Sequence, residues 1–213
     1  MKIIRNIIFD LGNVILNVDV KSTVNAFNLL AKKDVNFENI AAKFKEEKVF
    51  DLIDANKISN SELRIILRKY LRNNISDSAI DKAWCAMLKN IPLGKFNFLK
   101  KNKKKYRTFL LSNTCELHHK CYTKYVQKEF GLNLLDDLFE KAYYSFKIGI
   151  TKPNPEIFKL VLNENNLISE ETLFIDDVEV NTEAACKLGI KGYLYKENEE
   201  FENIIEKISN IEH

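Results

Sequence analysis

Short apolar runs rich in β-branched and aromatic residues recur along the chain, and amphipathic stretches separate the later ones. Runs that are apolar throughout, without alternation, are typical of strands covered on both faces. Such strands are predicted over residues 3–9, 108–111, 141–144, 172–175 and 192–195. Helices are predicted over residues 117–130, 155–164, 180–188 and 201–208. Because strands and helices alternate, we expect a three-layer α/β sandwich around a parallel, Rossmann-like sheet.

The stretch from about residue 20 to residue 89 interrupts this alternation with several amphipathic helical patterns and no convincing strand. Residues 51–54 and 59–62 mark joints, and Ser59 followed by Glu62 is typical of a helix N-cap. We interpret the block as a cap over the carboxyl ends of the strands, where open α/β sheets bind ligands. A separate helical domain is the alternative, but the first strand needs parallel neighbours that come only after the block. The expected division is a core of residues 1–18 and 90–213 and a helical cap of residues 19–89.

The 213 residues are 46% hydrophobic, which is enough for a sizeable core. A formal net charge of +3 is too small to indicate binding to nucleic acid or to an anionic membrane. We interpret the basic run at residues 100–105 as the solvated end of a helix, because no aromatic residues interleave it. No apolar run has the length of a signal peptide or a membrane span. We expect a cytoplasmic protein that is a monomer or a homodimer.

Four cysteines, Cys85, Cys115, Cys121 and Cys186, have no framework spacing, so we expect reduced thiols. The segment 115–121 contains zinc-ligand types, but Cys121 would point away from the others on a helix, and structural zinc is not favoured. His118 in this segment either faces the active site and contacts substrate or lies at the surface or against the cap. For Trp84 we favour a core position over stacking on a sugar.

Polar residues follow the predicted strands at positions that a parallel sheet brings to one edge. Asp10 follows the first strand, residues 112–114 (Ser-Asn-Thr) follow the second, and Asp176 with Asp177 follows the fourth. Lys152 lies in a turn that leads into a helix. Each feature alone is typical of a cap or a turn, but together they provide carboxylates for a hard cation such as Mg²⁺. The hydroxyl, the backbone N–H groups and the lysine are suited to holding phosphoryl oxygens.

In this order the residues resemble the four motifs of the haloacid dehalogenase-like (HAD) hydrolase superfamily, most of whose members are phosphatases. The wording Phe-Asp-Leu-Gly-Asn-Val, Leu-Ser-Asn-Thr, Lys-Pro-Asn-Pro-Glu-Ile-Phe and Phe-Ile-Asp-Asp is most similar to a bacterial subgroup that includes a phosphatase of sugar 1-phosphates. It also resembles the phosphatase half of mammalian soluble epoxide hydrolase. The resemblance extends from Asp10 to Asn181, and the helical block resembles the family's cap.

The resemblance implies a role for each matching residue. Asp10 would be the nucleophile that forms an aspartyl-phosphate and also a Mg²⁺ ligand. Gly12 would ligate Mg²⁺ through its backbone carbonyl, which needs no side chain. Lys152 would stabilise charge on the nucleophile and on the phosphate.

The remaining matches concern phosphate and metal binding. Ser112 and the Asn113 amide would bind the phosphoryl group. Asp177 would be the direct Mg²⁺ ligand, because it precedes Asn181 at the spacing of the family's acidic motif. Asp176 is the second candidate ligand and would act through water.

Gly12 departs from the pattern, because most phosphatases of this family have an aspartate there as general acid and base. The similar subgroup shares the glycine. We hypothesise that Gly12 favours esters of acidic alcohols, such as sugar 1-phosphates, which need less proton donation on leaving. Asp19 is a possible replacement for the missing general base, although we favour the interpretation that it is a carboxylate at the hinge of the cap.

We therefore expect a Mg²⁺-dependent phosphatase that hydrolyses a small soluble phosphate ester, with a sugar phosphate as the favoured example. A metal-independent dehalogenase is one alternative, which Asp176 and Asp177 disfavour because that reaction needs no metal site. A phosphomutase is a weaker alternative, since it would need control of proton transfer at Gly12. A third alternative is a non-catalytic protein that binds a phosphorylated ligand.

Overall fold

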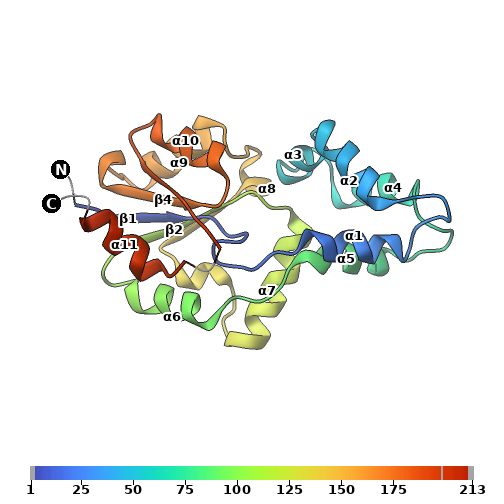
Figure 1. Ribbon diagram of the computed structural model, residues 1–213, viewed down its shortest axis with the longest axis horizontal. Coiled ribbons are helices and arrows are strands. Elements are labelled where there is room, and N and C mark those ends of the chain that lie inside the picture. The colour runs from blue at the N-terminus through green and yellow to red at the C-terminus, as the bar shows by residue number, and fades with distance from the viewer. Residues whose placement is uncertain (1–2, 198, 211–213) are drawn as a thin grey trace.

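The computed structural model describes residues 3–197 and 199–210 and contains a five-stranded parallel sheet (Figure 1). The strands are β1 (Asn6–Phe9), β2 (Arg107–Ser112), β3 (Lys141–Tyr144), β4 (Thr172–Asp176) and β5 (Lys191–Leu194). Their order is β3-β2-β1-β4-β5. The chain therefore begins at the centre of the sheet, winds outward to β3 and returns to build the other side. This topology confirms the predicted parallel, Rossmann-like α/β fold.

Alternate residues of the central strands pack against helices on opposite faces of the sheet. Ile7 and Phe9 of β1 belong to a core cluster with α6 (Leu93–Asn102), α7 (Glu116–Phe130) and α11 (Phe201–Asn210). Ile8 belongs to another cluster with α9 (Pro155–Glu164) and α10 (Glu179–Cys186). Figure 1 shows these two groups of helices on opposite sides of the sheet. Burial on both faces explains why the strands are apolar throughout.

Between β1 and β2 the chain forms a helical insertion, which we define as residues 20–87. Its hydrophobic cluster includes Phe27, Leu63 and Trp84, so Trp84 has the predicted core position. The Ser59 and Glu62 side chains form the predicted capping box at the start of the fourth helix. The elements of the insertion are α1 (Val20–Asn28), α2 (Phe37–Glu46), α3 (Val49–Asp54), α4 (Asn60–Arg68), α5 (Asp77–Trp84) and the 3-10 helix η1 (Cys85–Met87).

Two antiparallel segments join the helical insertion to the sheet. Val18 and Leu88 form an isolated antiparallel bridge, and the Asn17 N–H donates to the Asn90 carbonyl at 2.9 Å. These pairs lie at the two predicted boundaries, between residues 18 and 19 and between residues 89 and 90. The chain thus enters and leaves the insertion at one place.

The remaining elements are short and connect the layers. They are η2 (Leu135–Leu138), α8 (Ser145–Ile148) and η3 (Ser169–Glu171).

The basic run at residues 100–105 covers the exposed end of α6, as predicted. The first strand is shorter than expected: Ile3 is 72% exposed, and pairing with β4 begins at Asn6. In the described part of the chain, no helix has the length and apolar character needed to cross a membrane.

The expectation of four reduced cysteines is wrong for one pair. Cys85 and Cys121 form a disulfide, because η1 packs against α7 and brings their Cα atoms to 6.6 Å. Cys115 is free and buried, and Cys186 is free and exposed. The disulfide therefore links the end of the helical insertion to a helix that packs on the sheet.

Candidate active site

Three strands end in polar side chains at the same edge of the sheet. Asp10 follows β1 directly, Ser112 is the last residue of β2, and Asp176 is the last residue of β4. The Asp10 N–H continues the ladder by donating to the Ile175 carbonyl at 2.9 Å. Because the strands are parallel, these ends meet at a cavity of about 320 Å³, which we call the edge cavity. All residues predicted for the site line it.

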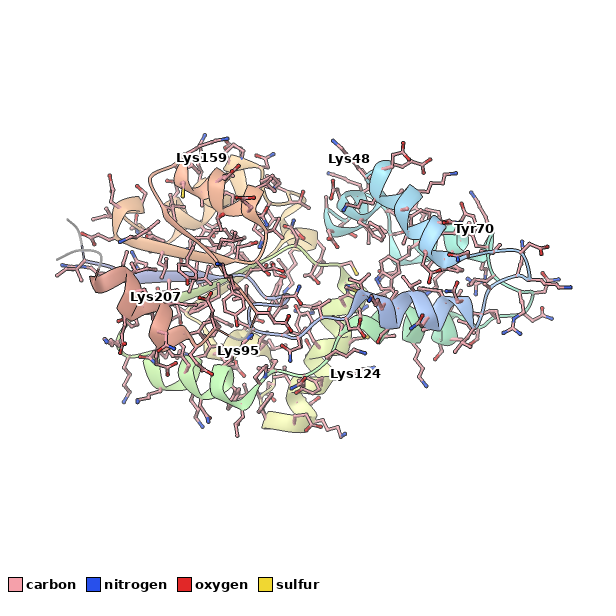
Figure 2. The ribbon with its side chains drawn as sticks, viewed as in Figure 1. Lys48, Tyr70, Lys95, Lys124, Lys159 and Lys207 are labelled. Carbon is pink, nitrogen blue, oxygen red and sulfur yellow. A yellow bond between two sulfur atoms is a disulfide. The ribbon has the colours of Figure 1, made fainter. Side chains whose placement is uncertain are left out.

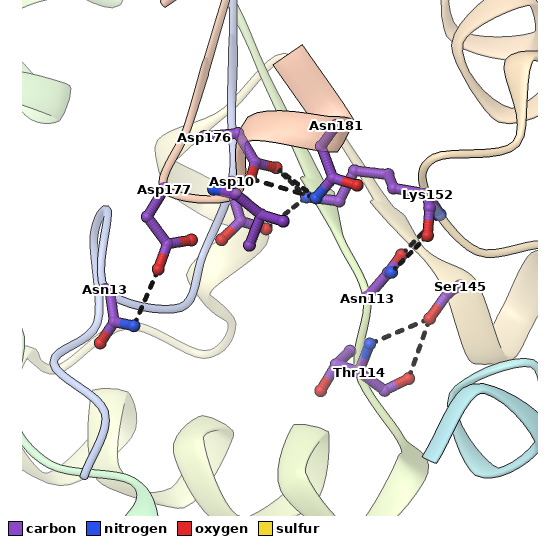
Figure 3. Close-up of polar contacts among 10 residues, drawn as sticks. Asp10, Asn13, Asn113, Thr114, Ser145, Lys152, Asp176, Asp177 and Asn181 are labelled. Atoms are coloured by element: carbon purple, nitrogen blue, oxygen red, sulfur yellow. Dashed lines mark hydrogen bonds and ion pairs between the residues drawn. The ribbon is translucent and has the colours of Figure 1, made fainter. Parts of the chain in front are cut away.

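Lys152 lies between two carboxylates in the edge cavity (Figure 3). Its Nζ donates to Asp10 Oδ1 at 2.5 Å and to Asp176 Oδ2 at 2.6 Å. The Lys152 side chain is only 1% exposed, so both ion pairs are shielded from solvent. By contrast, the exposed Lys48 and Lys159 side chains extend outward from the ribbon (Figure 2). A lysine that is buried in this way can stay charged because two carboxylates pair with it.

The backbone around Lys152 is held by Asn113. The Asn113 side chain donates to the Lys152 carbonyl at 2.9 Å and accepts from the Lys152 N–H at 2.8 Å. Nearby, the Ser145 hydroxyl at the start of α8 accepts from the Thr114 N–H at 2.9 Å and donates to the Thr114 carbonyl at 3.1 Å. The side chain of Asn113, a predicted phosphate ligand, therefore fixes the position of Lys152.

Burial and charge compete in setting the protonation of this cluster. Burial raises the pKa of Asp10 to about 7, and the Lys152 ammonium offsets only part of that effect. Burial alone would lower the pKa of Lys152, but Asp10 and Asp176 outweigh it, so the pKa is raised. Lys152 is therefore positively charged at neutral pH and favours the ionised form of its carboxylate partners.

Asp176 and Asp177 are neighbours in sequence but have different surroundings. Asp176 is fully buried, and its oxygens accept from the Asn181 amide at 3.1 Å and from the Val178 N–H at 2.8 Å. Asp177 is partly buried and accepts from the Asn13 amide at 2.9 Å. Burial raises the pKa of Asp177, and the hydrogen bond from Asn13 opposes this rise. Asp177 thus keeps more of its lone pairs for a further ligand.

Gly12 lines the edge cavity beside Asp10, and neither space nor backbone conformation requires a glycine there. A methyl group at this position would lie 3.7 Å from Val18 Cγ2 and 3.9 Å from Asp10 Oδ2, which are ordinary contacts. The Gly12 carbonyl accepts from the Val14 N–H at 2.6 Å, and its second lone pair can serve a cation. The absence of a carboxylate at Gly12 is therefore a chemical feature of the site.

Asp19 does not take the place of that carboxylate. Its side chain caps α1, accepting from the Lys21 N–H at 3.1 Å and from the Ser22 hydroxyl at 2.6 Å. The Ser22 hydrogen bond is the main reason that the pKa of Asp19 is lowered. Among the described residues that line the edge cavity, Asp19 is not included. Its position agrees with the favoured interpretation of a carboxylate at the hinge.

His118 lies where the edge cavity meets the helical insertion. Its Nε2 donates to the Trp84 carbonyl at 3.2 Å, and its ring stacks on the Trp84 indole with centroids 5.6 Å apart. Burial lowers the pKa of His118, so the imidazole is neutral at neutral pH. The His118 ring therefore packs against the helical insertion, as one alternative predicted, and it also lines the edge cavity. Its contact with substrate stays a prediction.

Asn13 is a site residue that the sequence did not reveal. It adopts a left-handed conformation, with φ of 57°, and its N–H donates to the Leu16 carbonyl at 2.8 Å. Asparagine is one of the few residues that tolerate this conformation, which places its amide beside Asp177 (Figure 3). A Gly-Asn pair after a buried strand was the available sign of such a turn.

The edge cavity offers oxygen ligands, although it has no metal site made from side chains alone. Across residues 3–197 and 199–210, no three His, Cys, Asp or Glu side chains are arranged to hold a metal ion. Mg²⁺ commonly takes one or two carboxylates and completes its shell with water and phosphate. Asp10, Asp177 and the Gly12 carbonyl provide such a set. Three carboxylates beside one ammonium also leave the cavity with excess negative charge, which attracts a cation.

The fold and the edge cavity are those of a haloacid dehalogenase-like hydrolase, and the chain belongs to this family, whose sequence profile matches residues 7–194. D-ribitol-5-phosphate phosphatase of Bacteroides thetaiotaomicron is 30% identical over 192 residues, which are 89% of this chain and 91% of that protein. The family resemblance drawn from the sequence is therefore confirmed.

Two solved structures support the same assignment. A HAD-family enzyme from Bacteroides thetaiotaomicron, in complex with magnesium and inorganic phosphate, has a TM-score of 0.81 and 35% identity. The match covers 94% of this chain and 98% of that chain. A HAD-like family hydrolase from Porphyromonas gingivalis has a TM-score of 0.85 and 28% identity, and the match covers 98% of each chain.

Proposed function

We propose that the protein is a Mg²⁺-dependent phosphatase that hydrolyses a small phosphate monoester through an aspartyl-phosphate at Asp10. The observation that carries this proposal is the buried ion-pair chain from Asp10 through Lys152 to Asp176, beside Ser112 in the edge cavity. These two ion pairs fix a carboxylate at a strand end, and Lys152 supplies positive charge next to the phosphoryl group. A relative named as a phosphatase and a neighbour bound to magnesium and phosphate support the same reaction.

The reaction follows from the position of Asp10. Its carboxylate oxygen forms a bond to phosphorus while the ester P–O bond breaks, and the alcohol leaves with a proton taken from water. Water then attacks the aspartyl-phosphate, which releases inorganic phosphate and restores the carboxylate. Lys152 holds Asp10 in place, and the Ser112 hydroxyl donates to a phosphoryl oxygen.

We propose that Asp10, Asp177 and the Gly12 carbonyl would hold the Mg²⁺ ion. A Mg²⁺ ion held there would supply positive charge to offset the negative charge of the phosphoryl group. We assign direct ligation to Asp177 because the Asp176 oxygens already accept from Lys152, from the Val178 N–H and from the Asn181 amide. Asp176 then contributes through water and through its hold on Lys152.

We also propose that residues 19–89 form a cap over the edge cavity. The paired connecting segments at Val18 and Leu88 provide a hinge at one side. On another side, the Asn60 amide donates to the Glu116 carboxylate, and Figure 1 shows α3 next to α8. Opening at the hinge would admit substrate, and closure would exclude bulk water from the edge cavity.

A phosphate-release assay over a set of phosphorylated metabolites tests this function. We expect activity that needs Mg²⁺, is abolished by a chelator, and falls on the order of 10³-fold or more in Asp10→Asn. Halide release from a haloacid that survives chelation would instead identify a dehalogenase. Ligand-dependent stabilisation without any phosphate release, unchanged by Asp10→Asn, would identify a non-catalytic binding protein.

A further inference from the structure

A second cavity, of about 300 Å³, lies inside the helical insertion and adjoins the edge cavity. We call it the aromatic chamber. His118, Asn113, Val20 and Met87 line both cavities, so the two share a wall. Its volume is at the lower end of the range for small-molecule sites. The aromatic side chains that line it are Phe27, Phe37, Phe44, Phe50 and Trp84.

One carboxylate, that of Asp54, lines the aromatic chamber. In the described part of the chain no hydrogen bond or ion pair involves this carboxylate. Asp54 is also the last residue of α3, and a negative charge at the C-terminal end of a helix is unfavourable. Burial raises the pKa of Asp54 to about 6. Asp54 is therefore unfavourable for folding because it has no partner, because it ends a helix and because it is buried. Residues that are unfavourable for folding are typical of functional sites.

The other polar groups of the aromatic chamber are already engaged. The Thr23 hydroxyl donates to the Trp84 carbonyl at 3.0 Å and accepts from the Met87 N–H at 3.0 Å. The Asn113 side chain is bonded to the Lys152 backbone. His118 donates through Nε2, so the neutral ring has only an acceptor left at Nδ1. A ligand in this chamber therefore meets acceptors and aromatic rings.

A polyol chain is a poor match for this lining. Each of its hydroxyl groups would lose hydrogen bonds to water, and the chamber provides few partners to replace them. A positively charged nitrogen matches it better, because it pairs with one carboxylate and is attracted by aromatic ring faces. The lining of the aromatic chamber therefore favours a cationic substrate over the sugar phosphate that we expected from the sequence.

We propose that the substrate is the phosphate monoester of an amino alcohol, with its cationic nitrogen in the aromatic chamber beside Asp54 and its phosphate in the edge cavity. This inference rests on the proposed phosphatase function and specifies its substrate class. Hydrolysis breaks the P–O ester bond and leaves the charged nitrogen unchanged. A cation near the ester oxygen also makes the departing alcohol more acidic, which suits a site with no side-chain acid at Gly12.

The test compares substrates of equal shape and different charge. Phosphocholine and 3,3-dimethylbutyl phosphate differ by one nitrogen in place of carbon, and O-phosphoethanolamine and ribitol 5-phosphate complete the set. We expect a kcat/KM for phosphocholine or O-phosphoethanolamine at least about tenfold above that for dimethylbutyl phosphate. Asp54→Asn should reduce this ratio at least about threefold, because only the attraction of the aromatic rings remains. The ratio should persist in Asp51→Asn, which changes an exposed carboxylate on the same helix.

Calorimetric titration with choline, with 3,3-dimethylbutanol as its neutral counterpart, tests the chamber without turnover. We expect choline to bind more tightly, and Asp54→Asn to reduce the difference to the part that the aromatic rings supply. Equal binding of the two, or a wild-type preference for ribitol 5-phosphate or dimethylbutyl phosphate, would overturn the substrate class while the phosphatase function stands. Selective choline binding with no phosphate release from any ester would overturn the phosphatase function instead.

Discussion

Asp54→Asn is expected to stabilise the folded protein at neutral and alkaline pH, even though it removes a charge from the aromatic chamber. Burial is the main reason that the pKa of Asp54 is raised from 3.8 to about 6, and His118 opposes the rise. Ionising this carboxyl group therefore costs more in the folded protein than in the unfolded chain. Asparagine has nearly the same shape and no charge, so it removes this cost.

The size of the effect follows from the pKa. A shift from 3.8 to about 6 corresponds to about 3 kcal/mol, at about 1.4 kcal/mol per pKa unit. Between these two values the folded state holds the Asp54 proton and the unfolded chain releases it, so wild-type stability falls as pH rises. The advantage of the variant is therefore nearly absent below about pH 4 and complete above about pH 7. For a chain of this size it corresponds to roughly 6–12 °C in Tm.

Urea denaturation between about pH 4 and pH 8 measures this difference directly. The comparison needs wild type, Asp54→Asn and Asp51→Asn, because Asp51 is exposed in the first turn of the same helix. Asp51→Asn should change the free energy of unfolding by no more than about 0.5 kcal/mol. A pH-independent difference between wild type and Asp54→Asn, or a variant less stable than wild type at pH 8, would refute the reasoning.

Three further predictions concern the edge cavity and the cysteines. Gly12→Asp should flatten the dependence of kcat/KM on leaving-group pKa, measured with a series of aryl and alkyl phosphates, and an unchanged slope would contradict the proposed lack of proton donation. Asn13→Ala should raise the Mg²⁺ concentration for half-maximal activity about tenfold, because it removes the hydrogen bond to Asp177, with kcat nearly restored at saturating Mg²⁺. Thiol titration of the unreduced, denatured protein should find Cys115 and Cys186 only, and four reactive thiols would disprove the disulfide.

The sheet edge could be predicted from the sequence because it depends on local features. Asp10, Ser112 and Asp176 each stand at the end of an apolar run, and a parallel sheet brings such ends together. The start of α9 was equally local, since Asn154 caps the helix and Pro155 occupies its first turn. In these cases a short stretch of sequence contains the physical cause of the structure.

Contacts between distant segments could not be predicted in this way. The Asn13 amide meets Asp177 across 164 positions, and the Cys85–Cys121 disulfide depends on how η1 packs against α7. Asp54 shows the same limit within one helix. It lies three residues after Asp51, so a helical pattern places both near one face, yet of the two only Asp54 is among the described residues that line the aromatic chamber. The neighbouring helices, rather than the local pattern, make that difference.

Both cavities have an excess of negative charge, but they differ in what supplies the missing cation. In the edge cavity Lys152 is committed to Asp10 and Asp176, so an incoming phosphate needs a metal ion to offset the carboxylates. In the aromatic chamber Asp54 faces nonpolar walls that attract a hydrated metal ion poorly, and the proposed cation belongs to the substrate. A ligand with one charge of each sign therefore binds in a single orientation. Inorganic phosphate has no group for the chamber, so the product should bind more weakly than the substrate and leave after hydrolysis.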